Sequence, residues 1–371
     1  APNAAAAYSL RSLTGGDPRV VRVRRVIDNA ESDFTASGVS SGALTSFVND
    51  IQTVGTAVNG TGSFDNYTVS NLSTTGFSAD NSAGGTGSAG FPYVFKDEDV
   101  LVIKYTVTNF SSTSSLSPKI RGTSSTSSAT EVTSGGTIFT ANGTYTDTLT
   151  GTSNGTHLMF ADGNTGSYTI SDFEIVSHSS NGFVETWYDQ SGNSNDAVQE
   201  TAGSQPKIVS AGTLLNELDF DGTADELAID FGADLSQANS LFMVHQSDST
   251  SSNSNDFFDR ISGSPRTLLD QSGSNYRMLS ASSVSTGVAV TTDKSLVFAL
   301  YNGASSLFAK NGTATSVLNA GTDGINQNSS LGSSGSNFYN GTMQEVIIYN
   351  SDQSSNRVAL ETNINSHYSL F

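Results

Sequence analysis

The chain contains no cysteine in its 371 residues. Disulfides and thiolate metal sites are therefore excluded, and stability must come from apolar burial and backbone hydrogen bonding. Long apolar runs are missing as well. The longest are Val100–Ile103 and Leu296–Leu300, which are far too short to cross a bilayer, so we expect no membrane insertion.

Histidine is scarce, and its four positions are scattered. His157, His178, His245 and His367 lack the spacing of metal ligands, and no Ser-His-Asp order can be argued from them. The sequence also has no Gly-x-Ser-x-Gly element and no P-loop. These absences leave no motif for nucleophilic hydrolysis or nucleotide binding.

Positive charge is low, with 16 Lys and Arg against 35 Asp and Glu and a formal net charge of −19. Such a field repels phosphate backbones, so we expect no nucleic-acid partner. It also disfavours anionic membrane surfaces. The plainest interpretation of the acidity is solubility at high copy number.

One dense positive patch stands out in the segment Arg19–Ile27, where apolar and basic residues alternate as in a half-buried strand. We predict that Arg22, Arg24 and Arg25 pair with acidic side chains, and that they hold this strand to the C-terminal part of the chain. Ligand binding by the patch is the alternative. The candidate acidic partners nearby are Asp28, Glu31 and Asp33.

Glycine, serine, threonine and asparagine dominate what the sequence does contain. Together with repeated Asn-Gly and Asp-Gly turns, this composition predicts an all-β fold of many short strands. Val100–Asn109 and Gly143–Leu149 are clear examples of predicted strands. A few short helices are expected over Ala4–Leu13, over Ser41–Asp50 and from Asp352 onward.

The character of the sequence changes twice along the chain. Gly-rich, low-charge sequence begins near Asn59, and a different pattern begins at Phe183. Residues 60–178 carry turns at a spacing that suits a compact β-sandwich. We therefore predict that this middle segment is a separable sandwich, and that residues 1–55 pack on residues 181–371.

Three motifs carry a resemblance to a known family. They are Ala4–Leu13, Phe183–Asn193 with its Trp-Tyr-Asp-Gln-Ser-Gly core, and Gln344–Asn350. Together they resemble laminin-G-like, concanavalin-A-type lectin sandwiches encoded by marine bacteriophages. The resemblance implies a discontinuous lectin-like domain made of residues 1–55 and 181–371.

The middle segment resembles a second family, the jelly-roll carbohydrate-binding modules. Gly143–Thr146 and Tyr168–Ile175 carry this resemblance. The two resemblances together imply a concanavalin A-like sandwich interrupted by an inserted jelly roll over residues 60–178. Insertion at a surface loop is physically easy, since neighbouring chain ends close at low entropic cost.

Sugar recognition usually places an aromatic ring against the C–H face of the sugar. Tyr93, Tyr145 and Tyr168 in the middle segment are the candidate carbohydrate-binding residues. For each of them, a half-buried position on a strand is the alternative. Trp187, the only tryptophan, sits in a strand-to-turn motif and is expected in the core.

No cofactor is expected, but calcium is possible, since lectin-like sandwiches often hold it. Asp189 with Asp196, or Asp219 with Asp221 and Asp225, could supply oxygen ligands. The alternative is that these carboxylates bond their own backbone in turns.

An enzyme is not expected. The opening segment and the Tyr188–Gly192 turn are also similar to a fungal-type arabinofuranosidase module. However, no matched motif supplies that family's nucleophile or acid, and a glycosidase needs two differently tuned carboxylates across a cleft. The Glu-x-Asp-x-x-Glu signature of laminarinase-type hydrolases is missing too.

The function implied by these resemblances is that of a non-enzymatic bacteriophage virion surface protein, such as a head fibre, a decoration protein or a tail-fibre component. It would bind glycans for adsorption, contact other virion proteins and form a homo-oligomer on the particle surface. The alternatives are a secreted or cell-surface bacterial glycan-binding protein and a glycoside hydrolase of arabinofuranosidase type. Because the chain opens at Ala1, we expect an N-terminus that is processed, trimmed or part of a larger particle.

Overall fold

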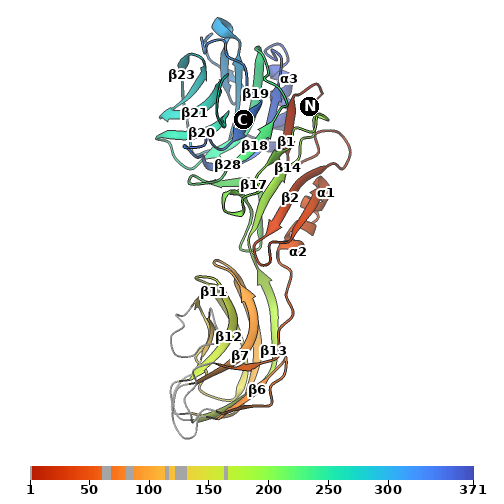
Figure 1. Cartoon of the computed structure of the whole chain (residues 1–371), viewed down its shortest axis with the longest axis vertical. Coiled ribbons are helices and arrows are strands. Elements are labelled where there is room, and N and C mark those ends of the chain that lie inside the picture. The colour runs from red at the N-terminus through yellow and green to blue at the C-terminus, as the bar shows by residue number, and fades with distance from the viewer. Residues whose placement is uncertain (1, 61–67, 81–86, 113–116, 122–131, 163–165) are drawn as a thin grey trace.

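The computed structural model describes residues 2–60, 68–80, 87–112, 117–121, 132–162 and 166–371. It confirms the predicted all-β class, because antiparallel strands make up most of the regular structure and the described helices are short. Two lobes are stacked along the long axis of the molecule (Figure 1). We call the lobe of residues 2–55 and 181–371 the upper lobe, and the lobe of residues 56–180 the lower lobe.

The lower lobe is a sandwich of two antiparallel sheets. Aromatic side chains fill the space between them, with the ring of Phe77 in contact with those of both Phe91 and Phe160. The described strands follow the orders β10-β11-β8-β13-β6-β5 and β4-β7-β12-β9. Their bounds are β4 (Val58–Asn59), β5 (Thr68–Ser70), β6 (Phe77–Asp80), β7 (Gly87–Phe95), β8 (Val100–Ser112), β9 (Ser117–Arg121), β10 (Thr133–Ser134), β11 (Gly143–Gly151), β12 (Gly155–Asp162) and β13 (Gly166–Ser179).

The upper lobe combines strands from both ends of the chain in one continuous sheet system. Its first half contains β1 (Ala6–Ser9), β2 (Arg19–Arg25), β3 (Glu31–Thr35), β14 (Gly182–Trp187), β15 (Ala197–Val198), β16 (Lys207–Ser210), β17 (Thr213–Asp221), β18 (Leu227–Asp230) and β19 (Asn239–Ser247). The remaining strands are β20 (Ser252–Arg260), β21 (Thr267–Gly273), β22 (Asn275–Ser280), β23 (Ser283–Ala289), β24 (Ser295–Tyr301), β25 (Leu307–Lys310), β26 (Thr313–Ala314), β27 (Asn328–Leu331) and β28 (Asn340–Tyr349). β1 pairs with β28, and β2 pairs with β14.

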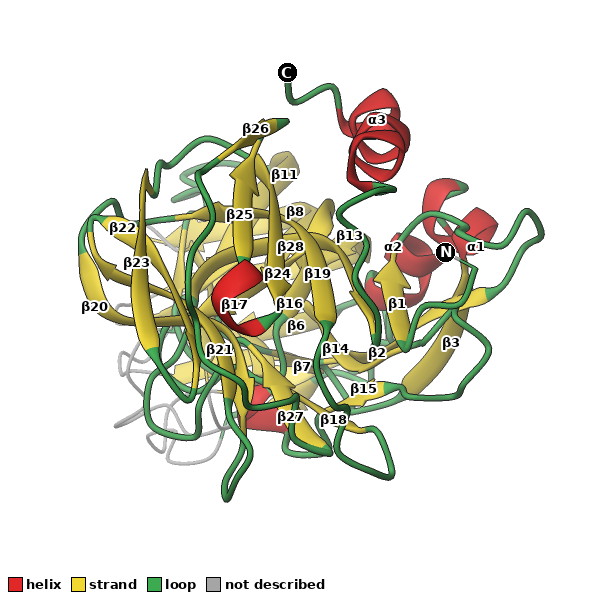
Figure 2. Cartoon of the chain, turned by 90° about the horizontal axis from the view of Figure 1, so that it is seen from above, coloured by secondary structure: helices red, strands yellow, loops and turns green. Residues whose placement is uncertain are grey.

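Three short α-helices lie on one side of the upper lobe, near the N-terminal segment (Figure 2). They are α1 (Ala36–Ser40), α2 (Ala43–Val48) and α3 (Arg357–Tyr368). α2 confirms the helix expected over Ser41–Asp50, whereas α3 begins five residues later than expected, after Asn356. None of the helices in the described part of the chain has the length and apolarity that a membrane crossing requires.

The prediction of a helix over Ala4–Leu13 is wrong. Ala6–Ser9 form strand β1, and all four residues are buried. Backbone pairing with the long central strand β28 and packing of Ala7 beside Ile347 outweigh the helix propensity of alanine, which is worth only tenths of a kcal/mol per residue. Trp187 is in the core as predicted, fully buried, with its ring 5.6 Å from that of Tyr8.

The prediction that the arginine patch pairs with acidic side chains is confirmed only in part. Arg22 pairs with Asp33 at 2.8 Å, and Arg25 pairs with Asp28 and Asp50, each at 2.8 Å. These partners all lie in the first fifty residues, and Asp33 also accepts from the Tyr188 hydroxyl at 2.7 Å, which ties the Arg22 pair to the C-terminal part of the chain. Arg24 contacts that part directly, without a carboxylate: it donates to Gln205 Oε1 at 2.7 Å and to the carbonyl of Ala202 at 3.0 Å.

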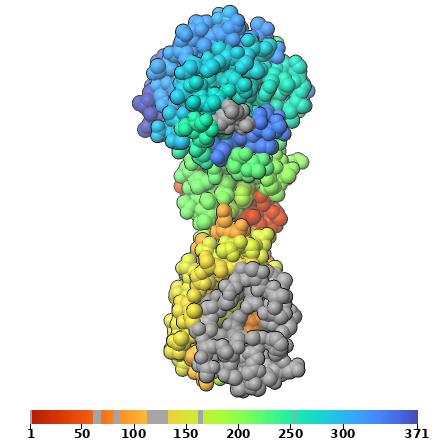
Figure 3. Space-filling view, turned by 90° about the vertical axis from the view of Figure 1, so that its left-hand side faces the viewer, coloured from red at the N-terminus to blue at the C-terminus, as the bar shows by residue number. Residues whose placement is uncertain are grey.

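The molecule narrows where the lobes meet (Figure 3). The chain leaves and re-enters the upper lobe at neighbouring points, since the Ser180 amide donates to Asn49 Oδ1 at 3.1 Å. Glu98, in the turn between β7 and β8, accepts from Asn181 at 2.8 Å and from Lys207 at 3.0 Å. Side chains of the upper lobe therefore bind directly to the tip of a lower-lobe turn.

Candidate functional site

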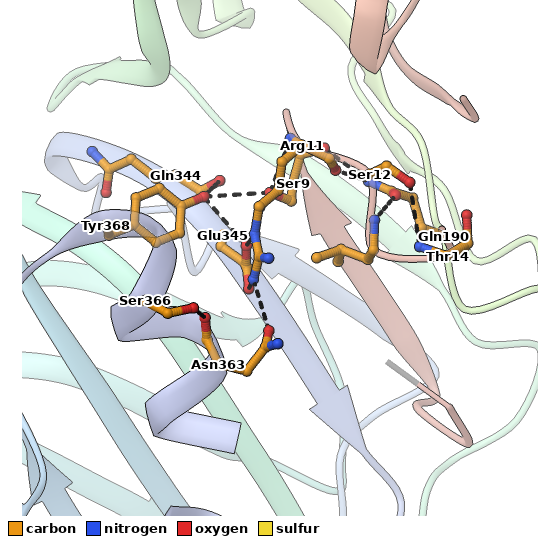
Figure 4. A network of polar contacts seen from close by, with 11 residues as sticks. Ser9, Arg11, Ser12, Thr14, Gln190, Gln344, Glu345, Asn363, Ser366 and Tyr368 are labelled. Carbon is orange, nitrogen blue, oxygen red and sulfur yellow. Dashed lines mark hydrogen bonds and ion pairs between the residues drawn. The ribbon is translucent and has the colours of Figure 1, made fainter. Parts of the chain in front are cut away.

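An ion pair between the first and last parts of the chain organises one face of the upper lobe (Figure 4). Arg11 follows β1, and Glu345 lies on β28. The guanidinium donates to both carboxylate oxygens, from Nε at 2.7 Å and from Nη2 at 2.9 Å. The Glu345 side chain is 1% exposed and that of Arg11 is 20% exposed, so the pair is bidentate and largely removed from water.

Helix α3 completes this network. Asn363 accepts from Arg11 Nη2 at 3.3 Å, and the Tyr368 hydroxyl lies 3.3 Å from Glu345 Oε2. Ser9 donates to the same Glu345 oxygen at 3.0 Å. Burial, and then the charge of Glu345, raise the pKa of Tyr368, so its hydroxyl keeps its proton and can donate. Arg11 is therefore held in one orientation by groups from three segments.

The Tyr188–Gly192 motif singled out in the sequence fixes the N-terminal segment against this network. Gln190 donates to the carbonyls of Ser9 and Arg11 at 2.9 and 3.0 Å, and accepts from the Leu13 amide at 2.8 Å. Asn193 donates to the Ala4 carbonyl at 2.8 Å. The motif therefore holds the segment that carries Arg11 in place.

A cavity of about 650 Å³ lies on one side of Arg11, between the N-terminal segment and α3. The buried residues Ile347 and Tyr349 of β28 form part of its lining, together with Leu13 and Leu360. Its other walls carry amide side chains. The four amide residues that line it are Asn3, Gln353, Asn356 and Asn363.

The chemistry of this first cavity suits a neutral, hydroxyl-rich ligand. Amides both donate and accept, as sugar hydroxyls do, while the aliphatic and aromatic residues offer contact to C–H groups. Its volume is within the range of small-molecule sites. Among the described residues that line it, none is Asp or Glu.

A second cavity of about 670 Å³ opens on the other side of Arg11 and shares Arg11 and Ser12 with the first. It is lined by Val39 and by Tyr368, and also by Asp17 and Lys294. Both charged groups already have partners: Asp17 accepts from Ser37 at 2.6 Å, and Lys294 pairs with Glu217 at 3.1 Å. The two cavities therefore adjoin, with a fixed guanidinium between them.

The three tyrosines predicted to bind carbohydrate do not form a platform. Tyr93 is 3% exposed and bonds His178 through its hydroxyl, and Tyr168 is 2% exposed among phenylalanines. Tyr145 is half-buried and stacks on Tyr105 with ring centroids 5.7 Å apart. Because an outward ring face is needed for stacking, the burial of Tyr93 and Tyr168 favours the alternative of core strand residues, and their role in carbohydrate binding stays a prediction.

The weak calcium candidates Asp189 and Asp196 act in a turn. Asp189 accepts from the amides of Ala7 and Ser191, each at 2.8 Å, and Asp196 accepts from the Asp189 amide at 2.8 Å. Over the described ranges, no group of three or more His, Asp or Glu is placed to hold a metal ion. Asp221 likewise accepts from the amides of its own loop, at 2.7 Å from Thr223.

A buried carboxylate pair lies away from both cavities. Asp256 on β20 faces Asp270 on β21, and each is at most 1% exposed. Asp270 pairs with Arg277, whereas Asp256 Oδ2 has no hydrogen-bond partner within the described structure. Burial, ahead of the charge of Asp270, raises the pKa of Asp256 to about 6. With so little exposure, neither carboxylate is accessible to a substrate in this arrangement.

Replacing Asp256 by asparagine should stabilise the protein at pH 7.5 and leave it unchanged near pH 4. The folded state favours the neutral Asp256 carboxyl. The stability that this preference contributes is therefore fully present below the ordinary aspartate pKa, and it is lost as the pH rises through the raised pKa of about 6. The gain at pH 7.5 should be about 2 kcal/mol. Thermal unfolding across this pH range measures it, with exposed Asp293 replaced by asparagine as the control. An equal gain at both pH values would show that the stabilisation does not come from the titration of Asp256.

Comparisons with known proteins give only distant likenesses. No protein-family model matches the chain, and no curated protein sequence does. It is similar to Trypanosoma rangeli sialidase in complex with the inhibitor DANA (14% identity, TM-score 0.33, 46% of this chain and 30% of that one). It is also similar to that sialidase in complex with sialic acid (13% identity, TM-score 0.34, 63% of this chain and 45% of that one). A third similar structure is truncated AlyQ with CBM32 and alginate lyase domains (13% identity, TM-score 0.23, 81% of this chain and 96% of that one). The chain therefore spans less than half of the length of the sialidase.

Proposed function

We propose that this chain is a non-enzymatic glycan-binding protein whose ligand occupies the first cavity and extends past Arg11 into the second. The observation that carries the proposal is the lining of the first cavity, with four amide side chains beside apolar surface. A sugar offers hydroxyl groups around its ring and C–H groups on its faces. The amide side chains therefore complement the hydroxyl groups of the ligand, and the apolar surface complements its C–H groups.

The fixed position of Arg11 supports this role. Its guanidinium is bound to Glu345, so the charge is compensated and the cavity does not require an anionic ligand. The amides Gln353 and Asn356 also bond each other at 2.9 Å, which holds them in position before a ligand arrives. Such preorganisation lowers the entropic cost of binding.

The proposal of binding without turnover is supported by the same lining. Glycoside hydrolysis uses two carboxyl groups on opposite sides of the scissile bond. The described residues around the first cavity supply none, and Glu345 beside it is saturated by Arg11, Ser9 and Tyr368. A bound glycan would meet donors and acceptors there, but no free acid or base.

We place the protein on a bacteriophage particle, as a head fibre, decoration or tail-fibre component used for adsorption. This part of the proposal rests on the sequence motifs at residues 4–13, 183–193 and 344–350. Single sugar contacts are weak, and many copies on one particle would supply avidity. The net charge of −19 suits a protein that is crowded on a surface and remains soluble.

Replacing Gln353 and Asn363 together by alanine should reduce glycan affinity by about tenfold or more, because each amide loses hydrogen bonds worth about 1 kcal/mol. A glycan array with the native chain selects the ligand, and titration of the variants measures the loss. Replacing Asn319, an exposed amide outside the cavities, is the matched control. Unchanged affinity in the double variant would refute the site. Release of reducing sugar by the native chain would refute the non-enzymatic assignment.

A further inference from the structure

A separate cavity of about 390 Å³ is lined in part by residues of β2, β14, β16 and β17. β2 and β14 run side by side at the end of the upper lobe that is nearer to the lower lobe (Figure 1). Arg24 of β2, Phe183 of β14 and Asp219 of β17 line it, together with Lys207 and Asp225. It shares no lining residue with the two cavities around Arg11. Its chemistry is also different, since five charged side chains line it beside a single amide, Gln205.

Asp225 is the most buried acid in this cavity. The residue is 7% exposed, and its Oδ2 accepts one hydrogen bond, from the Asp221 amide at 3.0 Å. Its Oδ1 has no hydrogen-bond partner among the described residues. Asp219, half-buried beside it, has no side-chain partner in the described part of the chain either. Two carboxylates therefore leave acceptor oxygens unused in a confined space.

The loop that carries Asp225 is fixed by its own backbone. Asp221 Oδ1 accepts from the amides of Thr223 and Ala224 at 2.7 and 2.9 Å. This turn keeps Asp221 occupied and positions Asp225 four residues later. The Asp225 carboxylate is in turn oriented by the hydrogen bond from the Asp221 amide to its Oδ2 at 3.0 Å, which also sets the direction of its free oxygen.

The two cations of the cavity already have oxygen partners. Arg24 donates to Gln205 Oε1 at 2.7 Å, to Asn29 Oδ1 at 3.0 Å and to the Ala202 carbonyl at 3.0 Å, and it lies 5.1 Å from the Phe183 ring centre. Lys207 pairs with Glu98 of the lower lobe at 3.0 Å. Among the described residues, the charged groups of the cavity that still lack hydrogen-bond partners are therefore carboxylate oxygens, which accept hydrogen bonds and carry negative charge.

We propose that this cavity is a second binding site, for a sugar-sized ligand that carries a primary ammonium group, with the ammonium between Asp219 and Asp225. An ammonium has three donors and no acceptor, which matches the unused carboxylate oxygens. Hydroxyl groups of the same ligand would meet the remaining polar lining. An anionic ligand would face the three carboxylates of Asp219, Asp221 and Asp225.

The electrostatics of the empty cavity agree with this ligand class. Burial, followed by the charge of Asp221, raises the pKa of Asp225 to about 7, and burial raises the pKa of Asp219 as well. A bound ammonium would favour the ionised carboxylates. Affinity should therefore increase between pH 5.5 and pH 8, by about tenfold, while an aliphatic ammonium stays charged throughout.

Three sugars that differ only at one carbon test the proposal on the full chain. They are 6-amino-6-deoxyglucose, glucose and glucuronic acid, titrated calorimetrically at pH 8. We expect the amino sugar to bind about tenfold tighter than glucose or more, and glucuronic acid to bind most weakly. Equal binding of the amino sugar and glucose, tighter binding of glucuronic acid, or no saturable binding of the amino sugar would each overturn the proposal.

Variants then locate the ligand. Asp225→Asn keeps the shape of the side chain, removes its charge and should bring the amino sugar to the affinity of glucose, whereas Asp293→Asn, outside the cavity, should change nothing. Asn363→Ala in the first cavity should leave amino-sugar binding intact. If Asn363→Ala abolishes it and Asp225→Asn does not, the ligand sits in the first cavity and the second site is wrong. The glycan proposal made above would survive that result.

Discussion

Replacing Arg11 by methionine is expected to lower the free energy of unfolding by about 3 kcal/mol, because a buried carboxylate loses its counter-charge. Glu345 is 1% exposed, and Arg11 supplies two of its hydrogen bonds. The remaining donors, Ser9 and Tyr368, are neutral hydroxyls. Chemical denaturation of the native chain and of the variant at pH 7.5 measures the difference.

The surface pair Arg19–Asp33 is the matched control. It has a similar distance, 3.0 Å, but its side chains are 60% and 29% exposed, so Arg19→Met should cost less than about 1 kcal/mol. A double variant with Glu345→Gln should recover much of the loss caused by Arg11→Met, since the buried charge is gone. Equal, small losses for Arg11 and Arg19 would show that the network of Figure 4 contributes little.

The sequence was sufficient to predict the fold class and several of the strands. Asn-Gly and Asp-Gly turns between alternating residues are local signals, and β8 and β11 follow the predicted segments Val100–Asn109 and Gly143–Leu149 closely. The failure at Ala4–Leu13 has a physical cause. Its partner strand β28 lies more than 330 residues later, and no local pattern encodes that pairing.

The candidate site was missed for the same reason. Arg11, Glu345 and Asn363 become neighbours only through the pairing of β1 with β28 and the docking of α3. The tyrosines were chosen by residue type, yet strand alternation turned Tyr93 and Tyr168 inward. One signal was present: the Gln344–Asn350 motif places two polar residues directly before an apolar run, in the middle of β28. A buried polar residue in such a strand needs a partner, which points to a network.

Replacing Asp99 by alanine should destabilise the lower lobe and its attachment by about 3 kcal/mol, because three hydrogen bonds to a fully buried carboxylate are lost together. Asp99 accepts from Ser180 at 2.6 Å and from the Lys96 amide at 2.7 Å, and lies 2.9 Å from His178 Nε2. His178 in turn bonds the Tyr93 hydroxyl at 2.9 Å. The carboxylate thus ties the β7–β8 turn to the strand that returns to the upper lobe.

This variant also tests whether residues 60–178 are a separable inserted domain, as we propose. If they are, calorimetry should show two transitions, and Asp99→Ala should shift the one that hydrogen exchange assigns to the lower lobe downward by about 10 °C. The upper-lobe transition should stay in place, because Asp99 contacts that lobe only through the connecting residue Ser180. Asp97→Ala is the control in the same turn, since that exposed carboxylate accepts only from the adjacent Glu98 amide, at 3.2 Å. A single transition that moves as a whole would mean that the two lobes unfold as one unit. The buried, hydrogen-bonded residues Tyr93, His178 and Asp99 would then belong to a structure that both lobes share, and the insertion proposal would be wrong.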